Sequence, residues 1–530
     1  MNQKNGISTR FMFMDPDGNN LKPFNEAVTA SIRLLGLWWK GIDGASPPLL
    51  SDGDVKNLSS SFDEHPEPSL LKEPYTKLGP CIKALFGSVR FNKHNMMNVH
   101  PTPFLPAVVA SLFTMLQNPN NLSPATSPAT TLLEEECISQ LADLLGFHEE
   151  NGAVKCGGNI LSCGSLSNLT ALMVAREKTY SKHYRGQSSE GLGLFGLPRG
   201  IIVTSKSAHY SIQKAARILG LGEGGVLEVP VADENEIAEF EKSGTPLKLK
   251  PTKEAYAEAF ERIEKGTHGA NSEGQLIISA VSTLGTISTG TIEPVQRLVD
   301  LRKEYGFHLH VDAAIGGLAL GLSEVKCKAA GVEQADSVTM DPHKLGFLHY
   351  PCSAVIFRKK SDLDVISTDA PYVDSSASTI EGSRPGSGVA GLWVALKTLG
   401  SEGYNRIIGE CIDLTRKLAN HLVDVGFQVL HEVDLNTLCF SIGYDGKTRK
   451  KLNRMTSDLH ARLVADGEYL LAKVEDLSGV MVRDRPWHSS SERVKVTGIK
   501  AWIMNPYTTE SDLESLVNRL HEKKKELSIS

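Results

Sequence analysis

The sequence has few cysteines, no long hydrophobic run and no excess of charge of one sign. Its eight cysteines include no Cys-x-x-Cys pair and no cluster with histidine at metal-ligand spacing, so we expect reduced, structural cysteines and no metal site. The longest apolar run, residues 104–116, is interrupted by Pro106 and is shorter than the ~20 residues that span a bilayer, so we expect no transmembrane helix and no membrane partner. The first 15 residues are polar and lack the apolar core of a secretory signal, so we expect a cytoplasmic protein.

Charge and composition are typical of a globular protein. Lys and Arg total 56 against 62 Asp and Glu, a formal net charge of −6, so we expect no nucleic-acid partner. Hydrophobic residues make up 41% and charged residues 22% of the 530 residues, which excludes disordered and collagen-like classes. At roughly 150 residues per domain, this length allows roughly two to four domains.

Secondary-structure patterns divide the chain into three parts. Prolines interrupt the first hundred residues, and we assign residues 1–125 to an N-terminal segment of short helices and extended arms. Residues 126–386 alternate helical segments with short β-branched runs, which predicts an α/β domain with a largely parallel sheet. The expected strands are residues 200–205, 226–231, 276–282, 308–314, 336–340 and 353–357. Residues 387–530 combine helices with alternating runs, which predicts a smaller α+β domain.

The segment 308–358 carries the most informative residues. Asp312 ends an expected strand, and the pair His343 and Lys344 follows the next one. A lysine amine bonds the aldehyde of pyridoxal phosphate, and a carboxylate keeps the pyridine nitrogen protonated so that the ring accepts electrons. We assign Lys344 and Asp312 to these roles, with Ala314 leaving room for the flat ring. Alone, an Asp at a strand end is commonly a cap and a Lys a surface charge, but their combination between apolar strands favours the cofactor.

Two further segments suit the same cofactor. Gly164 and Ser165 lead into a helix whose first turn offers N–H groups and the positive end of its dipole to a phosphate, and Asn168 offers another donor. His209 follows the strand at 200–205, where its ring would stack on the pyridine. Each of these residues also has an ordinary interpretation. Ser165 and Asn168 could be helix caps, and His209 could be a cap or a core residue. Lys344, further along the chain, favours the cofactor-binding interpretation.

Together these segments resemble the group II pyridoxal-phosphate-dependent amino-acid decarboxylases, the family of the glutamate, aromatic-amino-acid, tyrosine, aspartate and diaminobutyrate decarboxylases. The similarity covers most of residues 94–506 through the motifs HPTPFLP, SPATTLLEEE, SCGSLSNLTAL, SAHYS, VSTLGTISTGTIEP, HVDAAIGG, DSVTMDPHK, STIEGSRPGSG and WIMNP. It implies the aspartate aminotransferase-like fold, fold type I, with a mostly parallel seven-stranded sheet. It also implies a homodimer with active sites at the interface and the N-terminal segment packed on the partner subunit.

The resemblance also implies a role for each candidate residue. The implied cofactor contacts are Lys344 for the covalent bond, Asp312 at the pyridine nitrogen, His209 on the ring, His343 beside the lysine, and Gly164, Ser165 and Asn168 at the phosphate. Tyr372, on the mobile loop that follows the strand at 353–357, would protonate the α-carbon after carbon dioxide leaves. Because Tyr372 follows a proline, an alternative interpretation is that it only anchors the loop.

The predicted activity is the removal of the α-carboxylate of an L-amino acid to give carbon dioxide and the amine. Asp341 and Ile315 depart from residues common in the family, so the branch and the substrate stay open. Lys500 lies where many members carry Arg, and a cation there suggests an acidic substrate, although a solvated charge is an equal interpretation. The segment HPTPFLP offers a flat apolar wall for an aromatic substrate instead.

Two alternatives to decarboxylation stand beside this prediction. One is another reaction with the same cofactor, such as that of an aldehyde synthase or another carbon–carbon lyase. In this family the aldehyde synthases replace the loop tyrosine, so Tyr372 argues against them. The other is a non-catalytic homologue, which the joint presence of Lys344, Asp312 and His209 makes the weakest alternative.

Overall fold

The computed structural model describes residue 29 and residues 93–529, except for residues 148–155, 184–196, 267–273, 369–377, 444–445, 487 and 489. Of these, residues 29, 93–95 and 461–470 belong to one compact unit, and the others form a second unit. The first hundred residues, predicted to form short helices and arms, therefore lie almost wholly outside the described part of the chain. All the candidate residues that the structure describes belong to the second unit.

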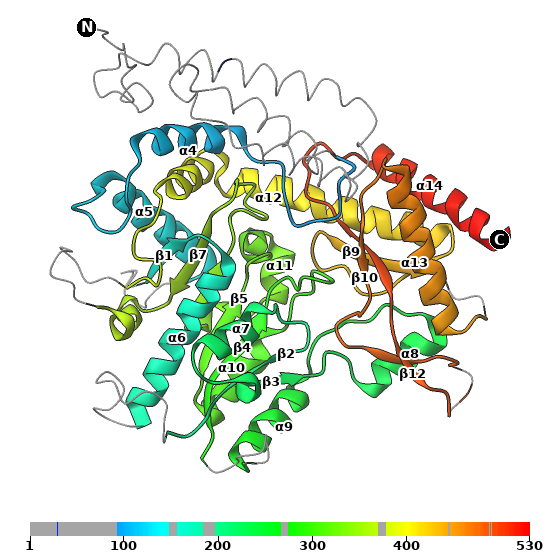
Figure 1. Cartoon of the computed structure of the whole chain (residues 1–530), viewed down its shortest axis with the longest axis horizontal. Helices are drawn as coiled ribbons and strands as arrows, with labels where there is room; N and C mark the ends of the chain where they lie inside the picture. The colour runs from blue at the N-terminus through cyan, green and yellow to red at the C-terminus, as the bar shows by residue number, and fades with distance from the viewer. Residues whose placement is uncertain are drawn as a thin grey trace, which may run out of the picture. The chain divides into compact units, whose positions relative to one another are not determined.

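A seven-stranded sheet forms the centre of the second unit (Figure 1). Its strands are β1 (Gly157–Leu161), β2 (Gly200–Ser205), β3 (Val226–Val229), β4 (Leu276–Thr283), β5 (His308–Asp312), β6 (Ser337–Met340) and β7 (Ser353–Phe357). Their order is β1-β7-β6-β5-β4-β2-β3, and β7 runs antiparallel to both of its neighbours while the other pairs are parallel. The predicted α/β fold with a mostly parallel sheet is confirmed. The sequence patterns missed β1, because its two glycines weaken the strand signal.

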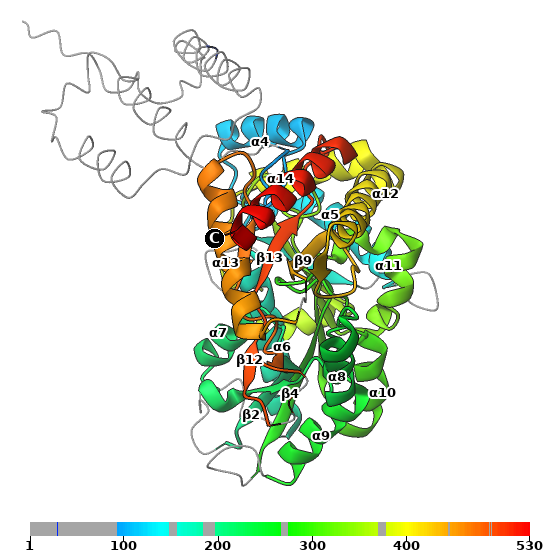
Figure 2. The ribbon, with the colours of Figure 1, turned by 90° about the vertical axis from the view of Figure 1, so that its right-hand side faces the viewer.

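Helices cover both faces of this sheet (Figures 1 and 2). In β2, Ile201 and Val203 pack on one face. The core there includes residues of α5 (Pro128–Leu145), α9 (Lys253–Glu264), α10 (Val295–Tyr305) and α12 (Ser387–Asp424), among others. Ile202 points to the other face, into a core shared with α6 (Gly164–His183) and α7 (Ser211–Ile218). Burial on both faces explains why the strands appear as continuous apolar runs in the sequence.

A smaller antiparallel sheet follows the large one. Its strands are β8 (Phe427–Val429), β9 (Thr437–Ile442), β10 (Ala472–Val474) and β13 (Gly498–Trp502), in the order β10-β13-β9-β8. The pair β11 (Met481–Arg483) and β12 (Arg493–Lys495) stands apart from it. Both sheets lie in one compact unit, so the predicted division between 126–386 and 387–530 stays a prediction.

The remaining helices are α4 (Leu105–Gln117), α8 (Glu234–Ser243), α11 (Ser323–Lys328), α13 (Arg449–Asp466) and α14 (Glu510–Ile529). Short 3-10 turns are η3 (Glu223–Gly225), η4 (Gly317–Gly321), η5 (Val332–Gln334) and η6 (Lys360–Ile366). The long α12 is interrupted at Gly400, whose φ of 57° suits a residue without a side chain. Among the described residues, no helix has the length and apolar character needed to cross a bilayer.

Candidate active site

Most of the candidate residues lie at one edge of the large sheet. Parallel strands end at the same edge, and β1 runs in the direction of β6 because both are antiparallel to β7. The edge therefore collects Gly164 after β1, Lys344 after β6, Asp312 at the end of β5 and His209 after β2. Ligands of α/β sheets bind at this edge, outside the carboxyl ends of the strands.

Lys344 is paired with a buried carboxylate that comes from the same turn. Its Nζ lies 2.9 Å from Oδ2 of Asp341, whose side chain is only 3% exposed. His343 Nδ1 accepts the N–H of Cys352 at 3.2 Å, so the imidazole proton is on Nε2, which lies 3.4 Å from the same Asp341 oxygen. Burial alone would raise the pKa of Asp341, but the Lys344 ammonium and His343 hold that pKa well below its usual range.

Gly164 lies directly against this carboxylate. A β-carbon at position 164 would be 2.7 Å from Oδ2 and 2.9 Å from Oδ1 of Asp341, too close for any side chain. The first turn of α6, which Gly164 and Ser165 begin, is therefore beside the Lys344–Asp341 pair. This contact joins the predicted phosphate-binding turn to the predicted cofactor lysine.

Asp312 and His209 are joined through a second set of contacts. The Asn168 amide donates to Oδ2 of Asp312 at 2.9 Å and to Oγ of Ser211 at 3.0 Å. Ser211 Oγ lies 2.9 Å from His209 Nδ1, and the Ala314 N–H donates to Oδ1 of Asp312 at 3.2 Å. The predicted residues Asp312, Ala314 and His209 are thus joined by one set of hydrogen bonds through Asn168 and Ser211.

The charges of this edge act on His209. Burial lowers the pKa of His209, and the nearby Asp312 carboxylate opposes that effect while the Lys344 ammonium adds to it. The lowered pKa leaves the imidazole neutral near pH 7. A neutral imidazole can stack on an aromatic ring without the cost of burying a charge.

Asn168 has a different environment from the one predicted. We expected its amide at a phosphate, but its oxygen and its nitrogen are occupied by Asp312, Ser211 and His310. It therefore lies against Asp312, the carboxylate that we predict for the pyridine nitrogen. Gly164 and Ser165 keep the predicted position at the helix start.

Two predicted residues are not brought into this cluster by the described contacts. Tyr372 lies outside the described residues. After that gap, Glu381 accepts the N–H of Ser162 at 3.2 Å, beside the end of β1. Lys500, on β13, donates from Nζ to the carbonyl oxygen of Ile287 at 3.0 Å, in the loop that follows β4.

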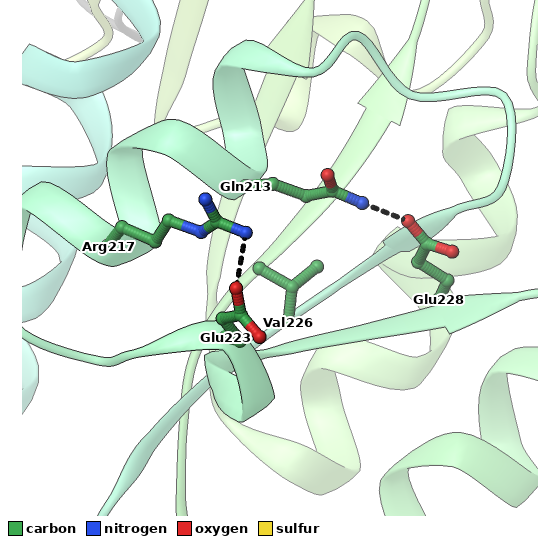
Figure 3. A pocket seen from close by; sticks show the side chains of 5 residues that line it. All are labelled: Gln213, Arg217, Glu223, Val226 and Glu228. Carbon is green, nitrogen blue, oxygen red and sulfur yellow. Dashed lines mark hydrogen bonds and ion pairs between the residues drawn. The ribbon is translucent and has the colours of Figure 1, made fainter.

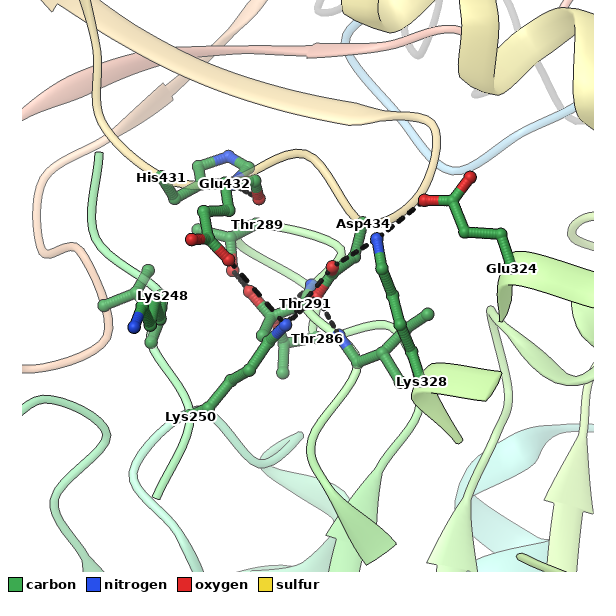
Figure 4. A network of polar contacts seen from close by, with 12 residues as sticks. Lys248, Lys250, Thr286, Thr289, Thr291, Glu324, Lys328, His431, Glu432 and Asp434 are labelled. Atoms are coloured by element: carbon green, nitrogen blue, oxygen red, sulfur yellow. Dashed lines mark hydrogen bonds and ion pairs between the residues drawn. The ribbon is translucent and has the colours of Figure 1, made fainter. Parts of the chain in front are cut away.

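The Ile287 loop is itself held by a polar network (Figure 4). Asp434, which is 1% exposed, accepts the N–H of Ile292 at 2.9 Å and pairs with Lys250 at 2.9 Å and Lys328 at 3.0 Å. Burial lowers the pKa of Lys500. A cation is thus placed on the small sheet next to a loop of the large sheet's functional edge.

Several buried hydroxyls near this edge have no hydrogen-bond partner within the described part of the chain. Among the described residues, Thr283 Oγ1, Thr339 Oγ1 and Ser207 Oγ are buried without a hydrogen-bond partner. Thr283 and Thr339 are the two residues that pair with Asp312 across the strands, and Ser207 follows β2. Buried polar groups normally have partners, so the residues present fit pyridoxal phosphate. Lys344 would bond it, Asp312 and His209 would hold its ring, and the start of α6 its phosphate.

Several of these residues were missed by sequence reasoning. Ser211, Thr283 and Thr339 lie within the motifs SAHYS, VSTLGTISTGTIEP and DSVTMDPHK, but nothing in those motifs singled them out from their neighbours. His310 had a signal, because two histidines alternate in the strand 308–312 and therefore share one face of the sheet.

Two other polar groups lie apart from this edge. A hollow beside α7 is lined by Gln213, Arg217, Glu223, Val226 and Glu228 (Figure 3). Its polar groups satisfy one another, since Arg217 pairs with Glu223 and Gln213 donates to Glu228, both at 2.6 Å. On α12 and α14, His421, Glu510 and Glu514 approach within 4.8 Å, but Glu510 is already paired with Lys417.

Comparisons with known proteins identify the family and the fold of this chain. A family model described as the pyridoxal-dependent decarboxylase conserved domain matches residues 56–443. The L-2,4-diaminobutyrate decarboxylase of Acinetobacter baumannii is 22% identical over 478 residues, 85% of this chain and 86% of that protein. The probable L-aspartate decarboxylase of Pyrococcus furiosus is 31% identical over 363 residues, 66% of this chain and 81% of that protein. Tryptophan decarboxylase of Catharanthus roseus, solved with L-tryptophan, has a similar fold, with a TM-score of 0.77 at 17% identity over 95% of this chain and 98% of that one.

Proposed function

Because the chain belongs to the pyridoxal-dependent decarboxylases, and is thus a pyridoxal-phosphate-dependent carboxy-lyase of amino acids, we propose that it decarboxylates an acidic L-amino acid. Lys500 is the observation that carries this proposal. Its ammonium is partly buried on β13, donates to one backbone carbonyl and lies 5.6 Å from the centroid of the Trp502 ring. No carboxylate pairs with it in the described contacts, so a substrate carboxylate would supply one. The names of relatives, such as the L-aspartate decarboxylase of Thermococcus kodakarensis, support the same class.

We assign the steps of the reaction to the residues at the sheet edge. When bound, pyridoxal phosphate accepts the electron pair that stays on the α-carbon as carbon dioxide departs. Lys344 would hold the cofactor through Nζ, and Asp312 would keep a proton on the pyridine nitrogen. His209 would orient the ring. A proton then replaces the lost carboxylate, and we assign its delivery to Tyr372.

An aromatic amino acid is the second candidate substrate. The His100 ring of the HPTPFLP segment packs edge-on against Tyr350 at 5.3 Å, and Tyr350 packs on His343 at 4.0 Å. This row of rings ends beside Lys344. It offers the flat wall that an aromatic side chain would use.

The test is a substrate screen of the purified, cofactor-loaded protein. Each of the twenty L-amino acids, 2,4-diaminobutyrate and ornithine is incubated with the protein, and carbon dioxide and the product are measured by mass spectrometry. We expect carbon dioxide and the matching amine from aspartate or glutamate, and neither from Lys344→Ala. An aldehyde in place of the amine would contradict decarboxylation and favour an aldehyde synthase.

Lys500 variants test the substrate class separately. We expect Lys500→Ala to raise KM for the acidic substrate about 10- to 100-fold, the cost of a lost charged hydrogen bond. Lys500→Arg keeps the cation and retains most of the affinity. An unchanged KM in Lys500→Ala, or turnover of aromatic amino acids only, would contradict the acidic class and favour the second candidate.

We also propose that two copies of the chain assemble into a homodimer. One face of α4 exposes Leu105, Val109, Leu112 and Phe113, with exposed fractions from 42% to 67%. These positions follow helical spacing, so they form one apolar stripe that a second copy would cover. The cytoplasmic location stays a prediction.

A further inference from the structure

Asn168 contacts both groups that we assign to the cofactor ring. It lies in the first turns of α6 and is 1% exposed. Its Nδ2 lies 2.9 Å from Oδ2 of Asp312 and 3.0 Å from Oγ of Ser211, and its Oδ1 lies 3.0 Å from Nε2 of His310. Each polar atom of the amide is therefore used.

The charge on Asp312 determines the direction of every hydrogen bond behind it. A carboxylate only accepts, so the Asn168 nitrogen faces Asp312 and the Asn168 oxygen must accept from the His310 Nε2–H. His310 Nδ1 then accepts the Ser337 hydroxyl at 2.9 Å. Ser337 Oγ in turn accepts the His308 Nε2–H at 2.8 Å. The chain of donors runs one way, from His308 to Asp312.

The second arm leads to His209. Ser211 Oγ accepts from Asn168, so its own proton is directed to His209 Nδ1 at 2.9 Å. The backbone N–H of Ser211 donates to the same nitrogen at 3.3 Å. His209 therefore carries its proton on Nε2, and its ring plane is held by two donors.

The histidines behind Asn168 stay uncharged. Burial lowers the pKa of His310 to about 4 and that of His308 to about 3. Asp312 is therefore the one charged member of this network. The Asn168 amide between Asp312 and His310 keeps one orientation, with its nitrogen toward Asp312 and its oxygen toward His310.

We propose that Asn168 is a positioning residue that orients Asp312 and His209 together, so that one side chain aligns the pyridine-nitrogen carboxylate with the ring-stacking imidazole. This inference rests on the proposed roles of those two residues. Asn168 would act through its hydrogen bonds to Asp312 and Ser211. The relay of His310, Ser337 and His308 keeps the amide in the one orientation that serves both.

The decisive variant is Asn168→Asp, which keeps the shape and removes the donor. Two carboxylates then meet at about 2.9 Å, so Asp312 and the new group share a proton and Asp312 loses part of its charge. We expect the affinity for pyridoxal phosphate, measured by titrating the apo-protein, to fall about 10- to 100-fold. We also expect the absorbance band of the lysine-bound cofactor to titrate at a different pH, and kcat to fall while KM changes little.

Asn436→Asp is the matched control. Asn436 is fully buried in the second unit, where its Nδ2 donates to the Ile503 carbonyl at 2.9 Å. This variant bears the same cost of a lost buried donor, so its thermal midpoint falls. Its cofactor affinity and the pH titration of its absorbance band should match those of the unmodified protein. If Asn168→Asp behaves like this control, the positioning role is overturned.

Ser211→Ala keeps the proposal testable if Asn168→Asp does not fold. It removes only the arm to His209 and leaves the Asn168–Asp312 bond intact. We expect a smaller loss of kcat than in Asn168→Asp, with an unchanged pH titration of the band. Unchanged kcat in Ser211→Ala would contradict the coupling. Failure of the proposed function is recognised separately, because the unmodified protein would then bind no cofactor, or Lys344→Ala would keep the band.

Discussion

At the scale of single residues, Glu293 shows how strongly this edge perturbs an acid. Its side chain is fully buried after β4, and Oε2 accepts the Thr283 N–H at 2.8 Å. Burial raises the pKa of Glu293 to about 7, and the Asp312 charge adds to that effect. Glu293 is therefore partly protonated at neutral pH. This protonation reduces the negative charge close to Asp312.

Glu293→Gln should remove a pH dependence of stability. Between pH 4.5, the ordinary pKa, and about 7, the folded protein holds a proton on Glu293 that the unfolded chain has lost. The free energy of unfolding therefore falls as the pH rises through this window, by about 3 kcal/mol. Urea unfolding of both proteins at pH 5 and pH 8 measures the effect. If the free energies of unfolding of the unmodified protein and of Glu293→Gln differ by the same amount at pH 5 and at pH 8, the assignment is contradicted.

At the scale of elements, the loop between β4 and α10 depends on a distant carboxylate. Asp434, between β8 and β9, reaches the N–H of Ile292 and two lysines (Figure 4). The same loop supplies the Ile287 carbonyl that holds Lys500. The small sheet and the functional edge of the large sheet are thus connected through a buried ionic group.

Asp434→Asn should loosen this connection. Removing the charge leaves Lys250 and Lys328 without their buried partner, at a cost of about 3 kcal/mol in the free energy of unfolding. We also expect KM for the acidic substrate to rise, because the loop that carries the Ile287 carbonyl would no longer hold Lys500 in place. Asp300→Asn is the control, since the Lys253–Asp300 pair is about half exposed and contributes less than about 1 kcal/mol. Equal effects of the two variants would contradict the role of Asp434.

At the scale of the whole molecule, the exposed stripe of α4 is the feature that needs a partner. Its four apolar side chains face away from the core, although the opposite face of the helix buries Ala107 and Ser111. An apolar helix face of this kind normally packs against another surface. The proposed homodimer supplies one.

Phe113→Glu should separate the two copies. We expect light scattering to give twice the 57.5 kDa chain mass for the unmodified protein and the single mass for the variant at micromolar concentration. Phe113 is 66% exposed, so the change costs little in the isolated chain. Ile218→Glu, at a position of α7 that is 68% exposed, is the control and should remain dimeric. A monomeric unmodified protein would contradict the proposal.

Much of this site was predictable because its chemistry is local in the sequence. Asp312 and Lys344 follow buried strands, and parallel strands bring their carboxyl ends to one edge whatever their order. Gly164 is recognised with Ser165 as the start of a helix, although strand β1 before it was not predicted. Asn168 could not be placed, because its contact with Asp312 spans 144 residues.

The sequence alone determined the mostly parallel α/β fold and the order of the chemical groups along the chain, since both follow from apolar runs and short motifs. Only the tertiary structure decided which groups meet. The strand order β1-β7-β6-β5-β4-β2-β3 brings α6 against β5, so that Asn168 reaches Asp312, and the packing of the small sheet carries Lys500 to Ile287 across 213 residues. Such contacts depend on how whole elements pack, and no local pattern records that packing.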